Sequence, residues 1–483
     1  MKLIRLSLWP QWLAASELFL MTLVTGLVAG WTSPYITKLD AATHPDSELP
    51  INETEASWIV SLINISRTGG SILSAIFVYS IGTKSTALVS GIPLAIGWIC
   101  FFIMNSVTLV YVSRILSGIG IGMYYSSFSK NNKLINIMAV TIINITLSTN
   151  FGMFFSCFPL YVGEIAHPKI RGALIALVMQ GLMVGNLCGT VIGKFVDLWM
   201  FAAIILVPNL IFLSSFCIMP HTPHYLIRRN EIDKAAKSIE FYDRNTDVKN
   251  QLEALKEFIQ SSKSLTFRDT IRELNTPVNR KALIMVNIVF AFFQLSGNYT
   301  VNAYMEILLT NARINVVVPS DLVISGNVLS IVSSWISIYT NDKYGRPVML
   351  LISSVGVGIG MFLWGLHYQL LDIGYTNPNL QWISIIALVV YQLSVPLGLI
   401  PVPSTLISEM FAPSVKNLSA SISSVISGLC AFAASRSYQP MVDALSEKYV
   451  FWIYSFLMFS SGLYSIIFIP ETKGKSLAEI QEI

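Results

Sequence analysis

Long apolar runs, separated by short polar turns, recur along almost the whole chain. A helix needs about 20 such residues to cross the hydrocarbon core of a bilayer. Unbroken apolar runs indicate helices, because the strands of a membrane barrel alternate apolar and polar residues. We expect twelve spans, near residues 12–34, 56–80, 86–105, 108–126, 172–193, 199–219, 281–304, 320–340, 348–368, 381–403, 418–436 and 449–469.

The composition supports a membrane protein. Hydrophobic residues make up 53% of the 483 residues, and charged residues only 12%. A soluble chain of this length would form about three domains, and so few charges could not cover their surfaces. We therefore predict an all-α polytopic protein that resides in a lipid bilayer.

One polar pattern occurs twice, about half a chain apart. An acid precedes a base by seven residues at the end of an apolar run, in Glu164 with Arg171 and again in Glu409 with Lys416. Such a repeat indicates two related helical bundles. We predict two six-helix bundles at residues 1–219 and 281–470, a cytoplasmic helical linker at residues 220–280, and a cytoplasmic tail at residues 471–483.

The basic residues of the short loops predict the orientation, since Lys and Arg stay on the cytoplasmic side. Lys84, Lys343 and Lys473 all fall on one side of a twelve-span arrangement, whereas the 35–55 loop is acidic. Both termini are therefore expected in the cytoplasm. Asn52 begins an Asn-Glu-Thr glycosylation site in an exterior loop, which favours the plasma membrane.

The sequence shows no sign of chemistry or of nucleic-acid binding. We find no nucleophile-and-base motif, no Gly-rich phosphate loop and no cofactor motif. The formal charge of +4 is accounted for by the bias of the cytoplasmic loops. We therefore predict that the protein is not an enzyme, that it binds no cofactor or metal, and that nucleic acid is not a partner.

Five short motifs carry a resemblance to a known family. They are Pro159-Leu-Tyr161-Val-Gly-Glu164-Ile with Arg171-Gly172, Pro220-His-Thr-Pro223-His-Tyr225-Leu226, Gln294-Leu-Ser-Gly297, Asp342-Lys-Tyr-Gly345-Arg346, and Pro470-Glu471-Thr472-Lys473-Gly474-Lys475-Ser476-Leu477. On these residues, nearly the whole chain resembles the sugar porters of the major facilitator superfamily, in particular the branch of the insect facilitated trehalose transporters. The resemblance implies alternating access to a small polar solute, with trehalose or a hexose as the expected substrate.

The resemblance also implies a gate of ion pairs at the cytoplasmic helix ends. A buried pair is expensive to break, so pairs that form only when this side is shut would stabilise the outward-open state. The alternative is that these charges are interface anchors and topology signals. The expected gate residues are Glu164, Arg171, Asp342, Arg346, Glu409, Lys416 and Glu471.

The sugar site departs from the family pattern. Sugar hydroxyls need hydrogen-bond partners, yet Phe293, Pro396 and Ser404 stand where the family places a glutamine, an acid and a tryptophan. Each remaining polar side chain could instead bond a neighbouring helix, and a sugar sensor or an inactive transporter-like protein is the alternative function. The remaining candidates for substrate binding are Gln180, Gln294, Asn298, Tyr299, Asn302 and Asn327.

Two further features bear on transport. Val28 stands where proton-coupled relatives carry an aspartate, which favours facilitated diffusion. Residues 127–156 form an unusual insert, because the family's fourth span would be continuous without them. The insert is either a retained intron or a genuine variant with a distorted fourth span.

Overall fold

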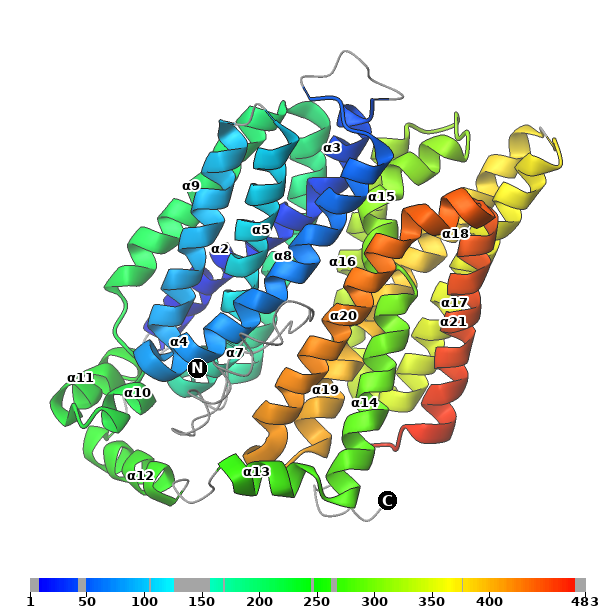
Figure 1. The fold of residues 1–483 in the computed structure, drawn as a ribbon. Coiled ribbons are helices and arrows are strands. Elements are labelled where there is room, and N and C mark those ends of the chain that lie inside the picture. Colours follow the sequence, from blue (N-terminus) through cyan, green and yellow to red (C-terminus); the bar gives the residue numbers. More distant parts are fainter. Residues whose placement is uncertain are drawn as a thin grey trace.

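A computed structural model of the chain describes residues 8–41, 49–103, 106–125, 157–167, 170–244, 247–261, 267–375 and 377–473. The described residues are almost entirely helical (Figure 1). The first half contains α2 (Trp9–Gly30), α3 (Thr32–Leu39), α4 (Glu53–Phe102), α5 (Val107–Tyr125), α7 (Cys157–Ile165), α8 (Arg171–Phe195) and α9 (Leu198–Ile218). The expected insert at residues 127–156 lies outside the described residues.

The second half follows four short helices. These are α10 (Pro223–Arg228), α11 (Ile232–Tyr242), α12 (Val248–Ser261) and α13 (Phe267–Leu274). The second half contains α14 (Pro277–Leu295), α15 (Asn298–Asn311), α16 (Pro319–Tyr344), α17 (Arg346–Asp372), a 3₁₀ turn η1 (Pro378–Leu380), α18 (Gln381–Ser394), a π-helical turn η2 (Val395–Leu399), α19 (Pro401–Met410), α20 (Pro413–Leu445) and α21 (Glu447–Phe468).

Eleven of the twelve expected spans are confirmed. Eleven segments of the described chain are long and apolar enough to cross a membrane, and the second part of α4, from Ser80, is one of them. The first part of α4, before the bend at Gly82, is helical over the range of the twelfth expected span. Arg67 lies within that first part, and span two was expected at 56–80 in spite of this charge.

The same sharp turn occurs once in each half. Gly82 has φ 85° and ψ 168°, and Gly345, between α16 and α17, has φ 88° and ψ 166°. Glycine adopts positive φ without steric cost. In both places a side chain from elsewhere fills the space where a Cβ would stand, Tyr225 at Gly82 and Glu471 at Gly345. The turn therefore supports the internal repeat that the acid-and-base pattern indicated.

Three spans that the sequence presented as single runs are interrupted. The first breaks at Trp31, between α2 and α3, and the seventh breaks at Gly297, between α14 and α15. Gly297 has φ 73°, and a Cβ there would lie 2.4 Å from the ring of Tyr454. The tenth span passes through η2 at Pro396, because proline removes a helical hydrogen bond.

The helices gather into two groups that meet at one end (Figure 1). Within the groups, α2 packs on α8 and α17 packs on α21; between the groups, α4 meets α20, α3 meets α15, and α8 meets α16. We call the end that carries α10 to α13 the linker side. The opposite end, where α3 ends and α4 begins, is the loop side.

Candidate functional site

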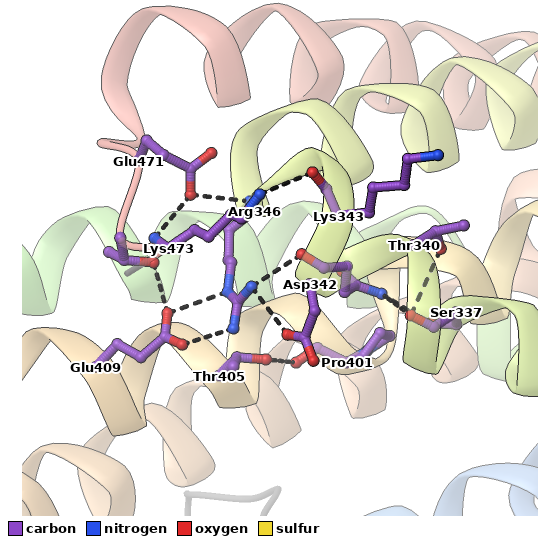
Figure 2. Close-up of polar contacts among 12 residues, drawn as sticks. Ser337, Thr340, Asp342, Lys343, Arg346, Pro401, Thr405, Glu409, Glu471 and Lys473 are labelled. Carbon is purple, nitrogen blue, oxygen red and sulfur yellow. Dashed lines mark hydrogen bonds and ion pairs between the residues drawn. The ribbon is translucent and has the colours of Figure 1, made fainter. Parts of the chain in front are cut away.

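Arg346 is the centre of a polar network on the linker side of the second half (Figure 2). Its Nη2 lies 2.7 Å from Oε1 of Glu409, and its Nε lies 3.2 Å from Oε2. A third nitrogen, Nη1, donates to the carbonyl of Asn341 at 2.8 Å and to Oδ1 of Asp342 at 3.3 Å. Only 10% of the Arg346 side chain is exposed. Two parallel bonds to one carboxylate fix geometry as well as charge.

The C-terminal tail joins the same network. Oε1 of Glu471 accepts hydrogen bonds from the backbone N–H groups of Arg346, at 3.3 Å, and of Lys473, at 2.9 Å. The hydroxyl of Thr472 donates to Oε2 of Glu409 at 2.5 Å. The network therefore ties the end of α21 to α17 and α19, all within the second half.

Lys416 lies near this network without pairing directly. Its Nζ donates to the carbonyl of Ser408 at 3.2 Å. Burial lowers the pKa of Lys416, and the nearby carboxylate of Glu409 opposes that change. Lys416, the base in the second copy of the acid-and-base pattern, thus lies near Glu409, the acid of that copy.

The first half has a looser counterpart. Oε2 of Glu164 accepts a hydrogen bond from Thr83 at 3.2 Å, and Arg171 donates to the carbonyl of Ala166 at 3.4 Å. Among the described residues, Glu164 and Arg171 form no ion pair with each other. Thr83 directly follows Gly82 as Arg346 directly follows Gly345. Lys84, one residue further on, donates to the carbonyl of Cys217 at 2.8 Å.

The hydrogen bonds and the ion pair that the structure gives between described residues of the two halves lie in the loop-side part of the helices. Between α4 and α20, Gln439 donates to Glu53 at 2.7 Å, Arg436 donates to Ser57 at 3.4 Å, and Asn64 donates to Ser435 at 3.1 Å. Between α3 and α15, the backbone N–H of Glu306 donates to the hydroxyl of Ser33 at 3.0 Å. Between α8 and α16, Lys194 forms an ion pair with Asp321.

Asn327 connects the halves within the membrane. Its Oδ1 accepts from Nδ2 of Asn186 at 3.0 Å, and its Nδ2 donates to the hydroxyl of Thr190 at 2.9 Å. Asn327 is on α16, and both partners are on α8. The structure thus places one sequence-predicted site residue on the boundary between the halves, with two partners that the sequence analysis missed.

Asn298 and Asn302 share a partner on the tenth span. The hydroxyl of Tyr391 donates to Oδ1 of Asn298 at 2.7 Å, and Nδ2 of Asn302 lies 3.2 Å from the same hydroxyl. Because Asn298 begins α15, the break at Gly297 places these amides directly after the bend in the seventh span. Tyr391 was not among the predicted residues, since the motifs of span ten pointed to later positions.

The other three predicted site residues are more dispersed. Gln294 donates to Ser427 at 2.9 Å, within the second half. Oε1 of Gln180, on α8, is buried without a hydrogen-bond partner among the described residues. Tyr299 is partly buried against the hydrophobic core and lies close enough to Arg114, in the first half, to act on its charge. Among the described residues, no hydrogen bond joins these three side chains to one another or to Asn298, Asn302 and Asn327.

The predicted glycosylation residue caps a helix. Oδ1 of Asn52 accepts from the N–H of Glu55 at 2.8 Å, and Glu55 accepts from the N–H of Asn52 at 2.9 Å. This reciprocal capping box begins α4. Asn52 is exposed on the loop side.

Two helical halves with one repeated glycine turn define the fold class, that of the major facilitator superfamily. The profile of the "sugar (and other) transporter" family matches residues 13–130 and 126–483. The chain belongs to this family. The two matched pieces meet at residues 126–130, where the insert is expected to begin.

Individual relatives agree with the family match. The chain is 25% identical to the facilitated trehalose transporter Tret1 of Anopheles gambiae, in a match that covers 98% of this chain and 56% of that protein. It is also 25% identical to Tret1 of Bombyx mori, in a match that covers 99% of this chain and 87% of that protein. The chain thus spans little more than half of some curated relatives. The inward-open xylose transporter XylE of E. coli has a similar fold, with a TM-score of 0.74, 19% identity, and coverage of 98% and 99%.

Proposed function

We propose that this chain carries a sugar across a membrane by facilitated diffusion, through alternating access between its two halves. Trehalose or a hexose is the proposed substrate. The observation that carries the proposal is the hydrogen bonding of Asn327 to Asn186 and Thr190 across the boundary between the halves. Polar groups there must keep partners when the halves separate, and the hydroxyls of a sugar can supply them.

The names of the relatives support the substrate and the passive mechanism. Tret1 of Anopheles gambiae and of Bombyx mori are both called facilitated trehalose transporters. We assign the linker side to the cytoplasm and the loop side to the exterior of the plasma membrane, from the distribution of basic residues. The proposed units are the bundles 1–219 and 281–470, the linker 220–280 and the tail 471–483.

The first test is uptake of labelled trehalose and glucose by cells that lack their own sugar uptake and express the full chain. We expect saturable uptake and counterflow with one of these sugars. Saturable sugar binding without flux would indicate a sugar sensor instead of a transporter. Neither binding nor flux for any sugar, with protein present at the cell surface, would contradict the proposal.

Replacing Asn327 with alanine tests the assigned site. We expect KM for the transported sugar to rise by about five- to tenfold, because the hydroxyls of the bound sugar would lose the Asn327 amide as a hydrogen-bond partner. Asn209→Ala is the matched control. Asn209 is also a buried amide, but it bonds the carbonyl of Gly91, at 3.2 Å, inside the first half. If both variants change protein abundance alone, Asn327 is a packing residue.

A further inference from the structure

Charges of opposite sign face each other across the loop side of the two halves. The first half contributes Lys38, on α3, and Lys194, on α8; the second half contributes Glu306, on α15, and Asp321, on α16. Lys194 forms an ion pair with Asp321, and the two side chains are 22% and 48% exposed. This ion pair joins two bundles, whereas the Arg346 network lies inside one.

Glu306 is the most enclosed member of the group. Its backbone N–H donates to the hydroxyl of Ser33, on α3, at 3.0 Å. Its Oε2 is buried without a hydrogen-bond partner among the described residues. The charged groups that act on its carboxylate are Lys38 and Lys194 across the boundary, and Asp321 on its own half. A buried carboxylate is costly unless opposite charges compensate it.

Lys38 is held in place by the first half. Its Nζ donates to the carbonyl of Val196 at 3.1 Å, and the hydroxyl of Tyr35 donates to the same carbonyl at 2.7 Å. Asp197 on the same half and Glu306 on the other both attract its ammonium group. Lys38 is therefore anchored where it can compensate Glu306 when the halves are in contact.

We propose that Lys38, Lys194, Glu306 and Asp321 form an exterior latch that holds the loop side closed. The inference rests on the proposed transport function. It adds the residues that set the balance between the conformation open on the loop side and the conformation open on the linker side. When the loop side opens, α3 and α8 separate from α15 and α16, and water replaces each attraction. The latch therefore favours the state in which the linker side is open.

The test measures how often the loop side opens. Ser57 lies in the closed boundary, with 1% exposure, so Ser57→Cys in the full chain reports opening through its labelling by a membrane-impermeant maleimide on intact cells. Labelling of the chain without this substitution is subtracted. We expect Lys194→Ala and Asp321→Ala each to raise the labelling rate by about two- to fivefold, the range for a partly exposed ion pair.

Two further variants make the result specific to the latch. The exchange Lys194→Asp with Asp321→Lys should return labelling towards the original rate. Lys448→Ala is the matched control, because Lys448 pairs with Asp372 at 2.9 Å on the same side but inside one half. Its labelling should be unchanged. Equal labelling in all variants would overturn the latch, as would an exchange that labels as fast as the single variants.

The labelling result is independent of the transported solute. If the latch variants label faster but no sugar is carried by the original chain, the latch holds and the proposed substrate fails. If sugar is carried and labelling does not respond, the latch alone fails. Thermal stability of each variant identifies labelling that arises from unfolding.

Discussion

Arg346→Ala should abolish most transport and lower the stability of the protein, because it removes the centre of the linker-side network. Glu409 would lose both bonds to the guanidinium and keep only the hydroxyl of Thr472. Breaking a buried pair by removing one partner costs about 3 kcal/mol or more. Glu409 is 24% exposed, which places the expected cost at the lower end of that range. We expect uptake to fall by more than about tenfold.

The measurements are sugar uptake, normalised to protein at the cell surface, and thermal unfolding in detergent. Arg346→Lys should give an intermediate result, because an ammonium group keeps the charge but cannot bond the carboxylate through a planar fork. Lys234→Ala is the control. Lys234 pairs with Glu231 at 2.7 Å on the surface of the linker, with 72% of its side chain exposed, so neither uptake nor stability should change measurably.

The outcome also separates two roles for the network. As a gate, the pairs are expected to form only when the linker side is shut. Here the pair of Arg346 and Glu409 is present while the hydrogen bonds described between the halves lie on the loop side. If the variant loses stability in proportion to its loss of uptake, the role of Arg346 is to stabilise the second bundle. A variant of full stability that cannot complete the cycle would favour the gate.

The spans could be predicted from the sequence because each is a local property of about 20 consecutive residues. The breaks at Trp31 and Gly297 were harder to predict, since an apolar run does not show where its helix bends. The turn at Gly345 was visible through its motif. Its counterpart at Gly82 was recognisable only by position, as the acid and arginine of the motif are missing there.

The candidate site was harder to predict, since its partners are distant in sequence. Asn327 could be selected as a polar residue within a span, but its partner Asn186 is 141 positions away. Glu306 was missed for a different reason. The seventh span was expected to end at 304, so no pattern indicated that this acid would be buried. Its environment depends on Lys38 and Lys194, which only the packing of α3 and α8 against α15 and α16 brings near.

Close packing of α2 on α8 leads to the second large prediction. A Cβ on Gly185 would lie 2.1 Å from the carbonyl oxygen of Leu23 and 2.9 Å from Cα of Gly26. Gly181 and Gly189, one turn to either side, face the same helix, where a Cβ would lie 2.7 Å from the carbonyl oxygen of Phe19 and 2.8 Å from that of Leu27. Small residues at four-residue spacing allow helix backbones to approach within a membrane. This interface supports Asn186, the partner of Asn327.

Gly185→Ala should therefore force α2 and α8 apart and sharply reduce the amount of folded protein. Backbone atoms cannot rotate away as a side chain can, so the cost should reach about 3 kcal/mol, the upper end for overpacking. The measurements are surface abundance and thermal unfolding. Gly69→Ala is the matched control, because Gly69 also lies in a membrane-crossing helix of the first half and a Cβ there would meet nothing within 4 Å. Normal abundance and stability of Gly185→Ala would show that the two helices can separate without cost.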